Sequence, residues 1–427
     1  MVVILSLGGM QKCWSQRQKI ELTFKQTLAL ALKNDLTLKL AQQNIKAAQA
    51  DLRYSKTRKL PKLSLMGYSG AAQYRGGIPV FNSFSVPAEE FELRPTLYGE
   101  IGLYFWQVLF DNKQTFYEIR EKSVILEAAE NEITRTRTET LFQAATAYCR
   151  ASHAETTLIY LGEEIELQKR LSSQFDNYFA AGLISKIEIE KIQQSRFELQ
   201  DRVGIVNLKN LELIMNLHAI LDIPKDEIIQ IETSHDIDFL KICRQARGGN
   251  GQIVNLEHKD AELEVKINDI RTQRAQKHNT IFVNLESYLK YSTSQSWVIG
   301  IGIHWPVWDG GEREALVELA QARHAAARTN LEIRKERINQ RLELTHAKLL
   351  IEYEKLQSLD LRINALEIEL SNAVGAQAGL EETLLVNRRR LDLLSLQLEK
   401  ANSLADFHST CLEFLKQTNC IEKLLAQ

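Results

Sequence analysis

The feature that most constrains the fold is an internal duplication of the chain. Residues 102–111 align with residues 300–309 at an offset of 198. Further along, Ala181-Gly182-Leu183 aligns with Ala378-Gly379-Leu380 at an offset of 197. Two matches about 80 residues apart that differ by only one residue in offset indicate two copies of one unit.

Each unit is expected to be mainly helical, because the 427 residues include only 20 Gly and 6 Pro. Each would contain a helix, a pair of strands, a second helix of about 60 residues, a Gly-centred turn and a returning helix. Apolar side chains step by threes and fours along the second copy's long helix, which is typical of a coiled-coil seam. The seam residues are Leu349, Tyr353, Leu356, Leu359, Ile363, Leu366, Leu370 and Val374.

The predicted boundaries follow from this order of elements. Residues 20–222 form the first unit, residues 223–252 a connector, and residues 253–427 the second unit with a C-terminal tail. Residues 1–19 are expected to be either a shortened secretory signal or a disordered N-terminus. The apolar run Val2–Met10 has the length of a signal's apolar region, but no basic residue precedes it. In each copy the first helix is expected to run without a break, in the first copy from Leu28 to Ile45.

The strand pairs, expected at about 62–107 and 280–306, show the pattern of membrane strands. In the second pair, apolar residues alternate with Gly300, Gly302 and His304 on the returning strand. Strands of 9 to 11 residues with aromatic residues near their ends are typical of outer-membrane barrels. A soluble hairpin lying on a core is the alternative. The predicted lipid-facing residues are Trp297, Ile299, Ile301, Ile303 and Trp305.

In its motifs the chain resembles the outer-membrane efflux proteins of the TolC type. The matching segments are Leu22-Thr23-Phe24 with residues 29–35, Leu60-Pro61, and Trp308-Asp309-Gly310-Gly311. Residues 178–185 resemble the helix-tip turn of that family. The resemblance covers residues 20–420, and the order and spacing of the motifs are more specific than any one of them.

The resemblance implies a homotrimeric duct in the outer membrane of a Gram-negative-type cell. Each chain would give four strands to a 12-stranded β-barrel, and its coiled-coil helical hairpins would form an α-barrel, the periplasmic tunnel. Geometry supports three copies, because eight strands enclose an interior filled by side chains whereas more strands leave room for water. The implied partners are outer-membrane lipid, a periplasmic adaptor protein and an inner-membrane transporter of an efflux or type I secretion system.

The helix tips are the predicted docking sites, because a hairpin tip is the part of a tunnel that can reach a protein at the far membrane. The alternative is that the two glycines of the docking set serve only to reverse the helices. The tip residues are Gly182, Leu183, Ile184, Ser185, Gly379 and Leu380, and the candidate gate charges are Glu188, Glu381, Glu382 and Arg388. The second copy departs from the family pattern at Asn279 and Leu385.

No catalytic, cofactor or metal site is predicted. The nine histidines include no pair spaced by three or four, and the chain has no GxSxG motif. The five cysteines show no CxxC spacing and are expected to be isolated buried thiols. A formal net charge of -2 gives no bulk attraction to nucleic acid. The second function that fits the long helices is a soluble coiled-coil scaffold or tether without transport activity.

Overall fold

The fold is that of a computed structural model, in which the chain forms two compact units. It describes residues 19–72, 96–180, 185–224, 227–232, 239, 241–243, 255–278, 280–291, 296–375 and 380–425. Unit 1 comprises Met1–Gln42, Glu132–His258 and Lys335–Gln427, and unit 2 comprises Gln43–Asn131 and Lys259–Arg334.

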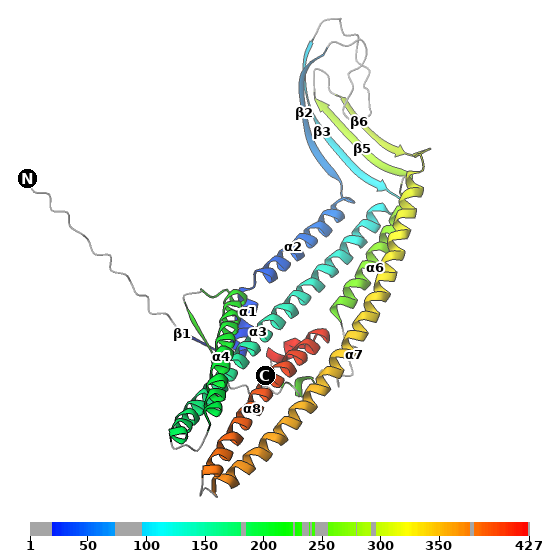
Figure 1. Ribbon diagram of the computed structural model, residues 1–427. Coiled ribbons are helices and arrows are strands. Elements are labelled where there is room, and N and C mark those ends of the chain that lie inside the picture. Colours follow the sequence, from blue (N-terminus) through cyan, green and yellow to red (C-terminus); the bar gives the residue numbers. More distant parts are fainter. Residues whose placement is uncertain are drawn as a thin grey trace, which may run out of the picture. The chain divides into compact units, whose positions relative to one another are not determined.

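Unit 2 is built around a four-stranded sheet. Its strands are β2 (Lys62–Ala72), β3 (Thr96–Phe110), β5 (Phe282–Tyr291) and β6 (Ser296–His304). They lie in the order β2-β3-β5-β6, and every neighbouring pair is antiparallel (Figure 1). Both predicted strand pairs are thus confirmed, and the sheet joins them through β3 and β5, which are far apart in the sequence.

The helices of unit 2 follow the same order as the strands. They are most of α2 (Leu36–Thr57), the first part of α3 (Gln114–Ala180), most of α6 (Leu256–Ala275) and the first part of α7 (Glu312–Gly375). The Lys122 ammonium lies 2.7 Å from the Asp51 carboxylate between α3 and α2. The Arg271 guanidinium lies 2.7 Å from Glu121 between α6 and α3, and the Thr272 hydroxyl donates to the Ala320 carbonyl on α7.

Unit 1 holds the main apolar core. Its elements are the rest of α3 and α7, α1 (Phe24–Asn34), α4 (Lys186–Leu221), α8 (Leu380–Gln417) and the short helix η1 (Ile421–Leu425). A parallel pair, β1 (Lys19–Leu22) and β4 (Ile228–Ile231), was not expected from the sequence. The buried Tyr148 hydroxyl donates to the carbonyl oxygens of Leu22 and Glu232, which ties this pair to α3.

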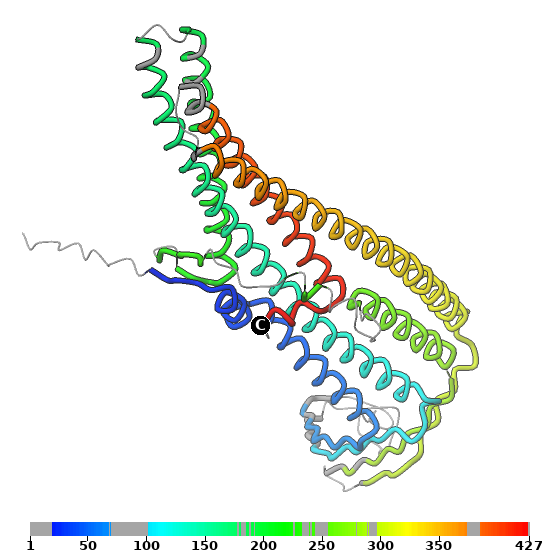
Figure 2. Tube along the Cα trace, turned by 90° about the horizontal axis from the view of Figure 1, so that it is seen from below, coloured from blue at the N-terminus to red at the C-terminus, as the bar shows by residue number. Residues whose placement is uncertain are grey.

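The seam predicted on α7 is confirmed from Leu349 to Leu370, and the side chain of Val374 lies outside the described residues. Leu349, Leu356, Leu359, Ile363, Leu366 and Leu370 are all buried, and Tyr353 packs against the core. Figure 2 shows α8, in orange to red, running beside the second half of α7. Ion pairs between Lys400 and Asp360 and between Lys355 and Glu399 join the two helices along their exposed edges.

Equivalent turns recur in the two halves of the chain. Asn112 and Lys113 have positive φ angles between β3 and α3, and Gly310 and Gly311 have positive φ angles between β6 and α7. These pairs are separated by the same 198 residues that align the sequences. Asp222 after α4 and Asn419 after α8, at an offset of 197, likewise both adopt positive φ. The duplication is therefore present in the backbone conformation, including positions where the residue types differ.

The expectation of one unbroken first helix is wrong. The helix ends at Asn34, and a new helix begins at Leu36. The Asp35 carboxylate accepts a hydrogen bond of 2.7 Å from the Thr37 amide, so it caps the second helix. Asn255 caps α6 in the same way, accepting from the amides of Glu257 and His258.

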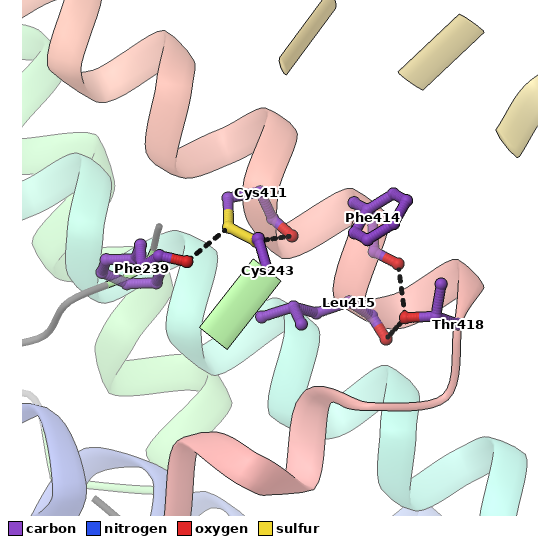
Figure 3. Close-up of a disulfide and its surroundings, with 6 residues drawn as sticks. All are labelled: Phe239, Cys243, Cys411, Phe414, Leu415 and Thr418. Carbon is purple, nitrogen blue, oxygen red and sulfur yellow. Dashed lines mark hydrogen bonds between the residues drawn. A yellow bond between two sulfur atoms is a disulfide. The ribbon is translucent and has the colours of Figure 1, made fainter. Parts of the chain in front are cut away.

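The expectation that all cysteines are isolated thiols is also wrong. Cys243 and Cys411 form a disulfide between the short helical segment after β4 and helix α8, across 168 residues of sequence (Figure 3). The Cys411 sulfur also lies 3.3 Å from the Phe239 carbonyl oxygen. Among the described cysteines, Cys149 is free and buried, and Cys420 is free and half-buried.

Candidate functional site: the two faces of the four-stranded sheet

One face of the sheet in unit 2 is mostly apolar on all four strands. The strand register places Leu65, Leu103, Leu289 and Trp297 in one row. The next rows on this face contain Leu63, Phe105, Ser287 and Ile299, then Gln107, Leu285 and Ile301, then Phe110, Val283 and Ile303. Because side chains alternate along a strand, these residues share a face.

The apolar face is exposed in the isolated chain. Ile301 is 64% exposed, Ile303 is 71% exposed and Leu65 is 71% exposed. The predicted residues Trp297, Ile299, Ile301 and Ile303 therefore lie together on one exposed face, and Trp305 follows the strand and is also exposed. The other three strands also contribute residues to this face. Among them are Leu63 and Leu65 on β2, which the sequence analysis did not include in the lipid-facing set. A large, mostly apolar exposed surface of this kind marks an interaction site.

The opposite face has a different chemistry. Lys62, Trp106 and Glu286 share one row with Gly300, and Asn284 lies opposite Gly302. The Asn284 side chain is buried and its amide donates to the Glu286 carboxylate. The first face is thus mostly apolar, whereas the second mixes polar, aromatic and glycine residues with a few apolar ones such as Val108 and Val298.

Among the strands that the structure describes, none pairs with the two outer edges of the sheet. β2 and β6 each have a single neighbour, β3 and β5 respectively. An edge strand presents unpaired amide and carbonyl groups that another strand can complete.

A cluster of ion pairs lies where the strands meet the helices. The Glu118 carboxylate pairs with Arg58 and, at 3.1 Å, with Arg274, and Glu121 pairs with Arg271 at 2.7 Å. Both carboxylates are buried, so each needs such partners. This cluster joins the end of α2 to α3 and α6, and sequence reasoning missed it because its paired residues are up to 156 residues apart.

The two predicted tips fall mostly outside the described residues. Gly182, Leu183, Ile184 and Gly379 are not described, and neither are the side chains of Glu188, Leu380, Glu381 and Glu382. Ser185 directly precedes α4 and is exposed, and Arg388 is exposed on α8. Beside them, Ile187 exposes 64% of its surface at the beginning of α4.

In the described ranges, no set of three His, Cys, Asp or Glu residues could hold a metal ion. Likewise, none of the described helices combines the length and apolarity needed to cross a membrane. Buried His153 and His408 approach each other to 3.1 Å between α3 and α8, a pair that sequence spacing could not reveal.

Comparison with solved structures assigns the fold. The chain is similar to the CmeC outer membrane channel of Campylobacter jejuni, with a TM-score of 0.72 and 14% identity over 93% of this chain and 85% of that one. The outer membrane protein VceC of Vibrio cholerae matches with a TM-score of 0.72 and 15% identity, over 93% of this chain and 96% of VceC. For the MtrE outer membrane channel of Neisseria gonorrhoeae, the TM-score is 0.66 and the identity is 14%, over 92% of this chain and 90% of MtrE.

These likenesses show that the chain has the fold of TolC-type outer-membrane channels. No protein-family model matches the sequence. A search of curated proteins likewise finds no match.

Proposed function

We propose that the protein is an exit duct of the outer membrane, formed by three copies of the chain. The observation that carries the proposal is the exposed apolar face of a sheet whose two edges are open. The likeness to outer membrane channels supports the same conclusion.

Lipid is the environment that suits this face. Apolar side chains on four adjacent strands lose contact with water when hydrocarbon covers them, at roughly 25 cal/mol per Å² of area removed. Backbone groups at an open edge cannot remain unpaired there, because each costs several kcal/mol in hydrocarbon. A membrane location therefore requires β2 and β6 to pair with strands of other copies.

The order of the strands permits such closure. With four strands that alternate in direction, β6 of one copy can pair with β2 of the next in an antiparallel manner. Two copies would give eight strands and an interior filled by side chains, whereas three copies give 12 and leave a water-filled channel. The polar face with Asn284, Glu286 and Gly300 would then line the lumen.

The helices would serve as the tunnel and the docking surface. We place the partner contacts at the two helix tips, at Leu183, Ile184 and Ser185 and at Leu380 in the second hairpin. The implied partners are a periplasmic adaptor and an inner-membrane pump. Glu188, Glu381, Glu382 and Arg388 are candidates for the charges that close the tunnel, because rings of like charge can bind or exclude ions at a narrow mouth. The duct itself would perform no chemical step.

Cysteine crosslinking between the two edge strands tests the proposal. Ser64→Cys on β2 is combined with Val298→Cys or Gly300→Cys on β6, in a Cys420→Ser background. All three positions share the face opposite the apolar one, and a side chain at Gly300 meets no atom within 4 Å. Because one copy keeps these strands apart with two others between them, a covalent link must join different copies.

We expect linked dimers and closed trimers in outer-membrane fractions, which dissociate with reductant. The three variants that carry only one of the introduced cysteines are the controls and should remain monomeric on denaturing gels. A soluble coiled-coil scaffold would instead remain in the soluble fraction and give no β2–β6 links, and that outcome would refute the duct.

A further inference from the structure

A cavity of about 500 Å³ lies at the base of the sheet in unit 2, on the face opposite the apolar one. Its sheet side is formed by Lys62, Trp106, Phe282 and His304, which the register places on that face. Its helical side is formed by the ends of α2 and α6 and the beginning of α3. The cavity therefore lies within one unit and is bounded by elements whose contacts the structure describes.

Aromatic rings form one part of the wall. Trp106 and Phe282 are stacked, with ring centroids 6.3 Å apart and an angle of 22° between the planes. The Lys62 ammonium lies 5.6 Å from the centre of the Trp106 ring. A flat aromatic ligand can stack on such a pair of rings. The positive charge of Lys62 lies beside the Trp106 ring, where it can attract a ligand's negative group.

Cations outnumber anions around the cavity. Arg58, Lys62, Arg274 and Lys277 line it, whereas Asp111 is the one acid among its described lining residues. The Asp111 carboxylate accepts a hydrogen bond of 2.8 Å from the Thr115 amide, so it caps α3.

The two arginines are already engaged, because both pair with Glu118. Lys62 and Lys277, in contrast, form no ion pair with any acid in the described ranges. Two ammonium groups without carboxylate partners beside a stacked aromatic pair favour a ligand that supplies a negative charge and a flat ring.

We propose that this cavity binds aromatic anions, compounds in which a sulfonate, carboxylate or phosphate is attached to a flat ring. The stacked pair Trp106 and Phe282 holds the ring, and Lys62 and Lys277 hold the anionic group. The proposal rests on the proposed function, in which this face lines the lumen, and it assigns the duct a class of cargo. A site at the base of the sheet would meet each cargo molecule as it passes from the helices to the strands.

Calorimetric titration of the purified full-length protein in detergent tests the site, with the titration into detergent alone subtracted. The probes are 2-naphthalenesulfonate and 2-naphthalenesulfonamide, which share the ring but differ in charge. We expect the sulfonate to bind about tenfold or more tightly than the sulfonamide, as charge-assisted contacts imply. Trp106→Leu should weaken both probes, because it removes the ring that both would contact.

The decisive variant is Lys62→Gln with Lys277→Gln, which should remove most of the preference for the sulfonate. Its matched control is Lys259→Gln with Lys266→Gln, which changes the net charge equally on α6 outside the lining of the cavity. Circular dichroism verifies that both variants fold. Equal binding of the two probes to the wild type, or an unchanged preference in the Lys62/Lys277 variant, overturns the proposal.

A parallel measurement separates this site from the duct. Wild-type protein is reconstituted into planar bilayers, and its channels are recorded in a salt gradient. If channels form but the protein binds the sulfonate no more tightly than the sulfonamide, the cavity proposal fails and the duct stands. If no channels form while the Lys62/Lys277 variant loses sulfonate binding, the duct fails and the binding site stands.

Discussion

Gly302 and Asn284 lie opposite each other on neighbouring strands, and the Asn284 side chain occupies the place where a β-carbon on Gly302 would be. Any residue larger than glycine at 302 must therefore displace the buried Asn284 amide. At Gly300, two residues earlier on the same face, an added β-carbon meets no atom within 4 Å. Position 300 thus has room for a larger side chain, whereas position 302 on the same strand does not.

This difference defines the test of the apolar face. If Ile301 contacts lipid, Ile301→Arg should destabilise the barrel by about 2–4 kcal/mol near the midplane of the membrane. Gly300→Arg points to the opposite face and should leave the trimer stable while narrowing the lumen. Gly302→Arg is a poor comparison, because its collision with Asn284 would add a cost of its own. Heat-dependent trimer dissociation on gels measures the effect, and equal losses for Ile301→Arg and Gly300→Arg would contradict a lipid-facing Ile301.

The Asp35 cap should make stability depend on pH. Burial raises the pKa of Asp35, but hydrogen bonds from Thr140 and Thr37 outweigh it and hold this pKa below its usual value. A lowered pKa in the folded state means that the ionised carboxylate stabilises the fold above about pH 4, and that this contribution is lost as the pH falls through the folded-state pKa.

Two substitutions at Asp35 separate the cap from the charge. Asp35→Ala should cost about 0.5–2 kcal/mol at pH 7, as for other lost caps. Asp35→Asn should cost less, because Asn255 caps the equivalent helix with its amide oxygen. Thermal melts followed by circular dichroism should show the wild type and Asp35→Asn converging as the pH falls below about 4. If the two proteins differ in melting temperature by the same amount from pH 7 to pH 3, the negative charge of Asp35 does not contribute to stability.

Reduction of the Cys243–Cys411 disulfide should destabilise unit 1. The bond closes a long loop of the unfolded chain, and the loss of such a crosslink typically costs about 2–5 kcal/mol. The double variant Cys243→Ala with Cys411→Ala should melt like the reduced wild type and show no further response to reductant.

Thiol labelling gives an independent check on the same bond. Burial raises the pKa of Cys149 to about 12, so this thiol should resist alkylation at pH 8 in the native protein. Cys243 and Cys411 should become reactive only after reduction and unfolding. Labelling of either residue in unreduced protein would show that the bond is absent.

The predicted docking at the first helix tip can be tested by a charge substitution. Leu183→Asp should abolish export while trimers and their heat stability remain as in the wild type, because a charge would be buried in the adaptor contact. Lys209→Asp, at an exposed position on helix α4, is the control and should retain export. Normal export by Leu183→Asp at wild-type protein levels would refute this docking site.

Local patterns predicted the parts of this fold that depend on neighbouring residues. The seam from Leu349 to Leu370 is recognisable because residues three and four apart share one side of a helix. The strand pairs are recognisable because alternation places Ile299, Ile301 and Ile303 on one face. The boundaries of the two predicted units, and the docking and gate residues, stay predictions.

Features that depend on distant residues were not predictable in the same way. Nothing near Cys243 indicates Cys411, because only the tertiary fold brings the short helical segment against α8. The same holds for His153 and His408, and for Arg274 and Glu118. The break at Asp35 had a local signal that was missed, since Asp is a preferred residue immediately before a helix. An apolar pattern that continued on both sides of Asp35 concealed it.

The two open edges of the sheet have a genetic consequence. If three chains close one barrel, a copy that cannot offer β2 or β6 does more than fail to work alone. It enters rings with normal copies, leaves a gap that lipid cannot fill, and so inactivates its neighbours as well. Substitutions along these two strands should therefore behave as dominant alleles when expressed beside the wild type, whereas loss of the whole protein should be recessive.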